Sequence, residues 1–186
     1  MIINIRGTSG SGKSTVMRRV MKQLGEPQLI KLKGKIMDYK IPTQWGDVYI
    51  LGRYETPCGG CDGIPTQDEV RRRVRKYSKK GHVLFEGLIV TSCYGKYRDL
   101  FRKSKQPYSF LFLKTNIETC IKRVEARRAK RGTTKPLNPA NTIAKYKCNM
   151  RVIERCEEDG EPFLHVGGNK AVEEILRSIK ENPWRS

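Results

Sequence analysis

Residues 7–14, GTSGSGKS, decide the fold of this chain. They follow the pattern G-x-x-x-x-G-K-S, which is typical of a loop that holds the phosphates of a nucleoside triphosphate. We expect Lys13 to reach the β and γ phosphates, and Ser14 (or Thr15) to bind Mg²⁺. The motif therefore predicts a site for ATP with Mg²⁺, whose loop residues are Gly7, Thr8, Ser9, Gly10, Ser11, Gly12, Lys13, Ser14 and Thr15.

The segments on both sides of the loop support this interpretation. The apolar run at residues 2–5 is typical of a buried parallel strand. After Lys13, apolar residues recur at helical spacing until Gly25 and Pro27 end the pattern. A loop between a strand and a helix directs the N-terminus of the helix toward the phosphates.

The rest of the chain alternates between the two periodicities. We expect helices that begin at a Thr66 cap, with Glu69 three residues on, and at an Asn116 cap. Residues 28–41 and 47–55 predict two short strands, which could form an antiparallel insertion. Further strands are expected within 82–87, 108–115 and 162–168, and further helices within 143–158 and 171–180, the former with Ile143, Tyr146, Met150 and Ile153 facing inward. The alternation predicts an α/β fold of the P-loop NTPase class, a parallel sheet with helices on both faces, in a single domain of residues 1–186.

The helix after Asn116 loses its apolar face beyond Val124 but keeps its cations. We expect it to leave the body of the protein and to form an Arg-rich helical lid, a hairpin at about residues 123–145. The cations predicted to contact the nucleotide are Arg123, Arg127 and Arg131, with Arg127 also predicted to be catalytic.

The charge of the chain points to a polyanionic partner. Thirty-eight Lys and Arg stand against 19 Asp and Glu, which leaves a net charge of +19. The excess is concentrated in residues 66–80, 96–105 and 122–135, a distribution typical of nucleic-acid binding, although a solvated basic surface is the simpler alternative. The predicted DNA contacts are Arg71, Arg72, Arg75, Lys76 and Lys79.

Three carboxylates are candidates for the chemistry. Glu86 ends a predicted strand at the sheet edge that carries the loop, and it is a candidate Mg²⁺ ligand or base. Asp62 lies in a glycine-rich loop and is the first choice for the general base, with Asp38 third. For each of them a turn or cap role is the structural alternative.

The cysteines and the apolar runs of the sequence bear on two other features, a zinc site and a membrane span. Cys58 and Cys61 have metal-ligand spacing, and zinc would need distant partners such as Cys148 or His82; packing cysteines are the simpler interpretation. Apolar runs stay well short of the ~20 residues of a membrane span, so we expect a protein of the cytoplasm, or of the host cytoplasm if a phage encodes it.

The motifs together resemble a known superfamily. A phosphate loop, a Glu closing HVLFEG and an Arg-rich helical hairpin are similar to those of the P-loop nucleoside and nucleotide kinases. Residues 49–64, YILGRYETPCGGCDGI, and residues 85–92, FEGLIVTS, resemble the small phage kinases that phosphorylate hydroxymethyluracil within DNA during thymine hypermodification. This resemblance implies that ATP is the donor and that a CH₂OH group on a pyrimidine in DNA is the acceptor.

Three functions remain open at this point: a DNA-base kinase, a kinase of free deoxynucleosides or their monophosphates, and a nucleic-acid-binding P-loop ATPase. The charge excess favours the first, because a kinase of free nucleotides has no use for a basic helix at residues 66–80. Tyr54, Tyr94 and Tyr97 lie near basic segments and could stack on a base, or could be ordinary core aromatics.

Overall fold

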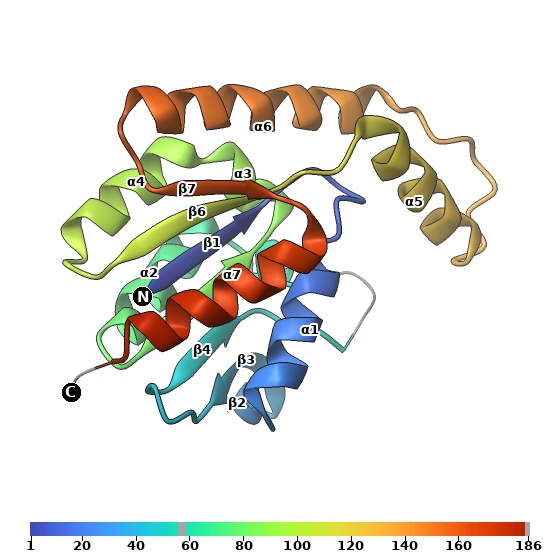
Figure 1. The fold of residues 1–186 in the computed structure, drawn as a ribbon. Helices are drawn as coiled ribbons and strands as arrows, with labels where there is room; N and C mark the ends of the chain where they lie inside the picture. The colour runs from blue at the N-terminus through green and yellow to red at the C-terminus, as the bar shows by residue number, and fades with distance from the viewer. Residues whose placement is uncertain (56–58, 185–186) are drawn as a thin grey trace.

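A computed structural model of the chain describes residues 1–55 and 59–184 (Figure 1). Seven strands of this part form one sheet in the order β2-β3-β4-β5-β1-β6-β7. The central strands β1 (Ile2–Arg6) and β5 (His82–Glu86) are buried along their whole length. Parallel pairing extends from β4 (Val48–Leu51) across to β6 (Tyr108–Leu113) and β7 (Phe163–Val166).

Helices cover both faces of the sheet, as predicted. The side chains of α1 (Lys13–Leu24) and α7 (Gly168–Glu181) pack into the core on one face. The core on the other face is built by α2 (Gln67–Ser78), α3 (Leu88–Ser92), α4 (Tyr94–Lys103) and α6 (Ala140–Glu158). Among the helices that the structure describes, none has the length and apolar composition needed to span a bilayer.

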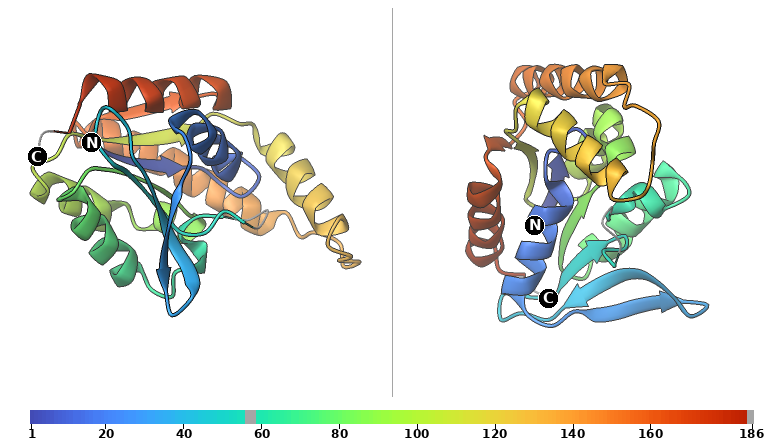
Figure 2. Two further views of the ribbon diagram at one scale, coloured as in Figure 1. Left: turned by 90° about the horizontal axis from the view of Figure 1, so that it is seen from below. Right: turned by 90° about the vertical axis from the view of Figure 1, so that its right-hand side faces the viewer.

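Two segments project from this body, as Figure 2 shows. One is α5 (Ile117–Ala129), which is capped by Asn116 as predicted and buries only Cys120 and Val124. The other is a hairpin at the edge of the sheet, formed by β2 (Gln28–Leu32) and β3 (Lys35–Ile41). The prediction of a single strand over residues 28–41 was therefore wrong. Lys33 and Gly34 both have positive φ, the conformation of a tight hairpin turn.

Two further details differ from the predictions. The sequence analysis did not anticipate α3 and α4, which fill the segment between β5 and β6. The predicted inward stripe of α6 is also displaced: Ile143, Tyr146, Met150 and Ile153 are half-buried. The buried residues of this helix are instead Thr142, Asn149, Val152 and Cys156. Two of these four are polar, so the apolar pattern alone misplaced the buried face.

One buried cation joins the sheet to α3. Arg6, the last residue of β1, is fully buried. Its guanidinium donates to the Asn4 side chain (2.6 Å) and to the backbone carbonyls of Val90 (3.2 Å) and Thr91 (3.3 Å). It also lies over the ring of Phe110, 5.0 Å from its centroid. Burial lowers the pKa of Arg6 to about 10, so the group remains charged at neutral pH.

We expect Arg6→Ala to destabilise the protein by about 3 kcal/mol or more, because it opens a cavity and leaves buried acceptors unpaired. Arg75→Ala is the matched control, since Arg75 is exposed on α2. Its free energy of unfolding should change by less than about 0.5 kcal/mol. Denaturant unfolding measures both, and equal stability of Arg6→Ala and the wild type would contradict this role.

Candidate active site

The phosphate loop lies at the carboxyl edge of the sheet, between β1 and α1. Gly10 and Gly12 have φ of 81° and 100°, a region that residues with a side chain rarely adopt. A Cβ added to Gly10 would lie 2.3 Å from the carbonyl oxygen of Cys120. Only glycine therefore lets α5 pack this closely onto the loop.

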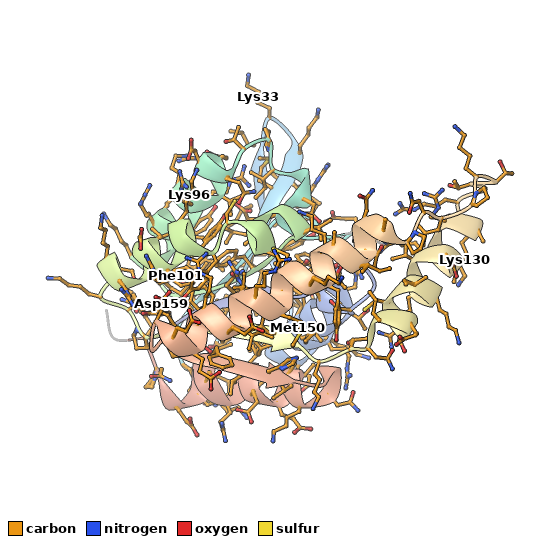
Figure 3. All side chains as sticks on the ribbon, turned by 90° about the horizontal axis from the view of Figure 1, so that it is seen from above. Lys33, Lys96, Phe101, Lys130, Met150 and Asp159 are labelled. Atoms are coloured by element: carbon orange, nitrogen blue, oxygen red, sulfur yellow. The ribbon has the colours of Figure 1, made fainter. Side chains whose placement is uncertain are left out.

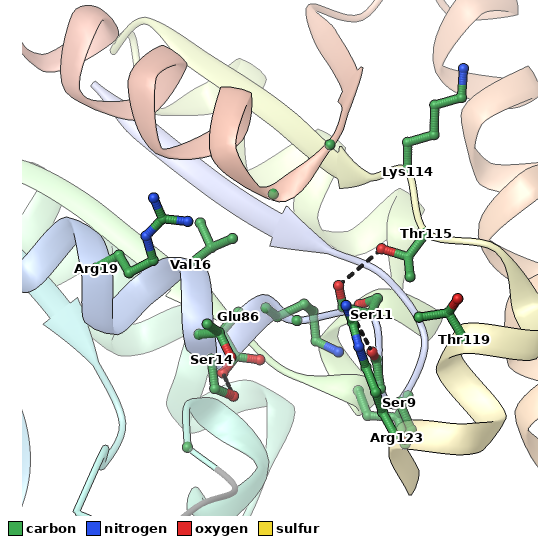
Figure 4. A pocket seen from close by; sticks show the side chains of 18 of the residues that line it. Ser9, Ser11, Ser14, Val16, Arg19, Glu86, Lys114, Thr115, Thr119 and Arg123 are labelled. Carbon is green, nitrogen blue, oxygen red and sulfur yellow. Dashed lines mark hydrogen bonds between the residues drawn. The ribbon is translucent and has the colours of Figure 1, made fainter.

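Contacts from three other elements hold the loop in place. The Thr8 hydroxyl donates to the carbonyl of Thr142 at the start of α6 (3.2 Å). The hydroxyl of Thr115 donates to the carbonyl of Ser11 (3.1 Å), and the guanidinium of Arg123 donates to that of Gly10 (3.2 Å). Figure 4 shows Thr115, Thr119 and Arg123 around the loop. The loop is thus held by the Thr115 side chain that follows β6, by the Arg123 side chain of α5 and by a backbone carbonyl of α6.

Lys13 and Glu86 form the charged centre of the site. The ammonium of Lys13 donates to the carbonyls of Gly7 (2.9 Å) and Thr8 (3.1 Å). Ser14 donates its hydroxyl hydrogen to Oε1 of Glu86 (2.7 Å). Burial lowers the pKa of Lys13 and raises that of Glu86, and the charge of each opposes the shift of the other. This geometry confirms that Glu86 and the loop share one sheet edge, because Glu86 pairs in register with Ile5.

The same oxygen atoms fit a magnesium ion. Mg²⁺ prefers oxygen ligands and is usually held by one or two protein groups together with phosphates and waters. The Ser14 hydroxyl and the Glu86 carboxylate, already in contact, supply such a pair. Within residues 1–55 and 59–184 no group of three or more His, Cys, Asp and Glu side chains could hold a metal. Cys58 of the predicted zinc spacing lies outside the described residues, and Cys61 is buried.

A cleft of about 1060 Å³ opens over the loop. Its lining includes two carboxylates, Asp62 and Glu86, among the described residues. Six cations line it as well: Lys13, Arg19, Lys114, Arg123, Arg127 and Lys170. Such an excess of positive charge suits a triphosphate. Arg131, predicted as a third lid contact, is not among the described residues of the lining.

Asp62 reaches the cleft from a short turn that follows the glycine-rich loop. Its Oδ1 accepts a hydrogen bond from the backbone N–H of Leu88 (2.7 Å), at the start of α3. Asp62 therefore caps the start of α3 and is at the same time exposed in the cleft. Gly60 supports the arrangement, because a Cβ there would lie 2.6 Å from Oε1 of Glu86.

Several predicted candidates lie elsewhere. Asp38 is buried beneath α2, where it pairs with Arg73 (3.0 Å) and accepts from the Tyr77 hydroxyl (3.0 Å). It is not among the described residues that line the cleft. The three candidate stacking tyrosines, Tyr54, Tyr94 and Tyr97, are all buried in the core.

The basic helix α2 is less available than its composition suggests. Arg71 pairs with Asp68, and Arg72 pairs with Glu69 (2.6 Å). The hydrogen-bonded ion pair with Arg72 first, and then that with Arg73, lower the pKa of Glu69 to about 2. Lys76 lies 5.3 Å from the ring centroid of Tyr77. Of the five predicted DNA contacts, Arg75, Lys76 and Lys79 have no ion pair within the described part of the chain.

The sequence analysis missed some residues of the cleft. Lys114 and Thr115 follow β6, and residues 167–170 follow β7. The signal was present, because ligands of open parallel sheets bind outside the carboxyl ends of the strands. The Gly167-Gly168 pair directly after β7 marks such a position.

A comparison with protein families identifies the chain. The family model described as 5-hmdU DNA kinase matches residues 1–155. The chain belongs to the 5-hmdU DNA kinase family. A 5-hmdU DNA kinase from Pseudomonas phage PaMx11 is 34% identical over 189 residues, which cover 95% of this chain and 97% of the relative. Another, from Pseudomonas phage M6, is 29% identical, with 97% of each covered.

The solved structures agree on the fold. A deoxyadenosine kinase from M. mycoides, with dCMP and dCDP bound, matches this 5-hmdU DNA kinase family member with a TM-score of 0.53. The two are 17% identical, and the match covers 97% of this chain and 99% of the other. The same kinase with bound dATP gives a TM-score of 0.51 at 16% identity. The prediction of a P-loop fold is therefore confirmed, and the family match confirms that of a kinase.

We expect Lys13→Ala to lower phosphoryl transfer by about a hundredfold or more, since it removes a preorganised cation from the phosphate loop. Lys170→Ala, at the exposed rim of the same cleft, is the control and should cost less than about tenfold. Steady-state turnover with saturating ATP measures both, and thermal unfolding confirms that the variants are folded. Wild-type turnover in Lys13→Ala would rule out this role for the loop.

Proposed function

We propose that this kinase transfers the γ-phosphate of ATP to the hydroxymethyl group of 5-hydroxymethyluracil in phage DNA. The observation that carries the proposal is one cleft that combines a phosphate loop, six cations and the carboxylates Asp62 and Glu86. The family and its phage relatives support the choice of acceptor. The host-cell cytoplasm, where phage DNA is made, is the expected place of action.

The donor half of the cleft binds the triphosphate. Lys13 leaves the loop carbonyls for the β and γ phosphates, and Arg123 and Arg127 neutralise the phosphate oxygens from α5. Ser14 and Glu86 would hold Mg²⁺, which neutralises charge on the β and γ phosphates when it is bound. The helical hairpin of α5 and α6 acts as the lid over this half, and the Thr8–Thr142 bond couples its base to the loop.

On the acceptor side, the hydroxymethyl oxygen attacks the γ-phosphorus. A new O–P bond forms as the bond from the γ-phosphorus to the β–γ bridging oxygen breaks, and ADP leaves with that electron pair. The hydroxyl proton passes to a carboxylate, for which Asp62 is the proposed acceptor because it is exposed in the cleft. Glu86, which is buried and accepts a hydrogen bond from Ser14, is the proposed Mg²⁺ ligand.

The hydroxymethyl group of a base within a DNA strand is accessible to an enzyme. The C5 substituent of a pyrimidine lies in the major groove, where an enzyme can reach it or extrude the base. The net charge of +19 attracts the phosphates of the strand. Arg75, Lys76 and Lys79 of α2 remain proposed backbone contacts.

Incubation with γ-labelled ATP tests the acceptor. We expect label on hydroxymethyluracil DNA and none on thymine DNA of the same sequence, because the latter lacks the hydroxyl. Free 5-hydroxymethyldeoxyuridine and its monophosphate complete the panel. Equal or faster labelling of the free nucleoside would favour a deoxynucleoside kinase over the DNA kinase proposed here.

Asp62→Asn and Glu86→Gln should separate the two carboxylates. If Asp62 is the base, its variant should lose roughly 10²- to 10⁴-fold in rate with little change in Mg²⁺ dependence. Glu86→Gln should raise the Mg²⁺ concentration for half-maximal rate. Rates measured across a Mg²⁺ series decide between them, and full activity of Asp62→Asn would remove this residue from the mechanism.

A further inference from the structure

A second cavity, of about 450 Å³, lies between the start of α4 and the middle of α6. We call it the α4–α6 groove. Its walls include Cys93, Tyr94, Gly95, Lys96, Arg151 and Arg155. Figure 3 looks down on this side of the molecule, where α6 carries Met150 and Lys96 is labelled. The described lining holds three cations and no carboxylate.

No ion pair among the described residues neutralises the cations of the groove. Lys96, Arg151 and Arg155 are each solvent-accessible and form no ion pair within residues 1–55 and 59–184. Arg155 instead lies over the Tyr94 ring, 5.3 Å from its centroid. Arg71 and Arg72 of α2, by contrast, are paired with carboxylates of their own helix. The groove thus gathers around one cavity three cations that have no ion pair with the described residues, an arrangement that suits the phosphates of an external ligand.

The groove is connected to the catalytic cleft by α3. Leu88, at the first position of this helix, lines the cleft, and Cys93, directly after its last residue, lines the groove. Five residues of helix rise by about 7.5 Å. A nucleic-acid strand advances by about 3.4 Å per nucleotide in a duplex. The two linings are therefore separated by about the length of two nucleotides of a strand.

We propose that the α4–α6 groove holds backbone phosphates of the DNA strand about two nucleotides from the reacting base. This inference rests on the proposed function, since it names the site that makes the acceptor a polymer. Lys96 and Arg151 contact the phosphates, and Arg155 adds positive charge to the wall. A free nucleoside carries no backbone phosphate for the groove to bind.

Gly95 allows a test that leaves the fold intact. A Cβ added at this position meets no heavy atom within 4 Å, and Gly95 lies in the first turn of α4. An acidic residue there stabilises a helix, and any residue other than proline improves on glycine. Gly95→Glu should therefore fold at least as well as the wild type while placing a negative charge in the groove. Gly95→Gln, of the same size but uncharged, is its matched control.

The measurement is the affinity for a hydroxymethyluracil oligonucleotide across a salt series, by fluorescence anisotropy. Gly95→Glu should bind about tenfold more weakly than Gly95→Gln. The variant Lys96→Gln/Arg151→Gln loses two phosphate contacts, which should flatten the slope of log affinity against log salt by roughly 1.4 to 1.8. This corresponds to a roughly 25- to 60-fold loss of affinity at 0.1 M salt. Lys22→Gln/Lys35→Gln removes the same charge from the last turn of α1 and the first residue of β3, outside the three basic segments, and should have little effect.

Unchanged affinity and salt slope in the groove variants would overturn the inference, as would an equal loss in Lys22→Gln/Lys35→Gln. Either result would speak against the groove and not against the proposed function, as long as the wild type still phosphorylates hydroxymethyluracil DNA. Failure of the proposed function would show differently, as the absence of transfer to that DNA by the wild type. ATP affinity should be the same in all variants, because none of these residues lines the cleft.

Discussion

The buried guanidinium of Arg6 fixes the one short helix on which the arrangement of both binding regions depends. Helix α3 has five residues, too few to be stable by itself in water. Arg6 binds the carbonyls of Val90 and Thr91 near its end, where a cation is favoured by the helix dipole. Asp62 binds the N–H of Leu88 at its start. The helix is thus held at both ends, between the cleft and the α4–α6 groove.

This arrangement explains how one small domain can act on a polymer. The cleft concentrates positive charge where we propose that the triphosphate binds, and it keeps two carboxylates beside the loop. The α4–α6 groove adds positive charge for backbone phosphates, which a free nucleoside lacks. Deoxynucleoside kinases share the fold, so the fold alone does not select the acceptor. We assign the selection of DNA over a free nucleoside to the surface around the cleft.

Much of the fold was predictable because local signals agreed with the global arrangement. The residues GTSGSGKS, the periodicity after Lys13 and the caps at Thr66 and Asn116 led to the correct elements. Glu86 was found because it ends a central strand. Tertiary pairing was harder to predict: α2 has a basic composition, yet Asp68 and Glu69 neutralise part of it. Burial of the polar residues Thr142 and Asn149 displaced the stripe of α6, and Arg6 gives no sign in the sequence that its charge is buried.

The most direct test of the account is the dependence of kcat/KM on acceptor length. Oligonucleotides with one hydroxymethyluracil would be extended by one nucleotide at a time on either side, at constant low salt. The account predicts a steep rise in kcat/KM once the flank on one side reaches about two nucleotides, the distance from the cleft to the groove. A value that is already maximal for the free nucleoside, and flat with length, would contradict it.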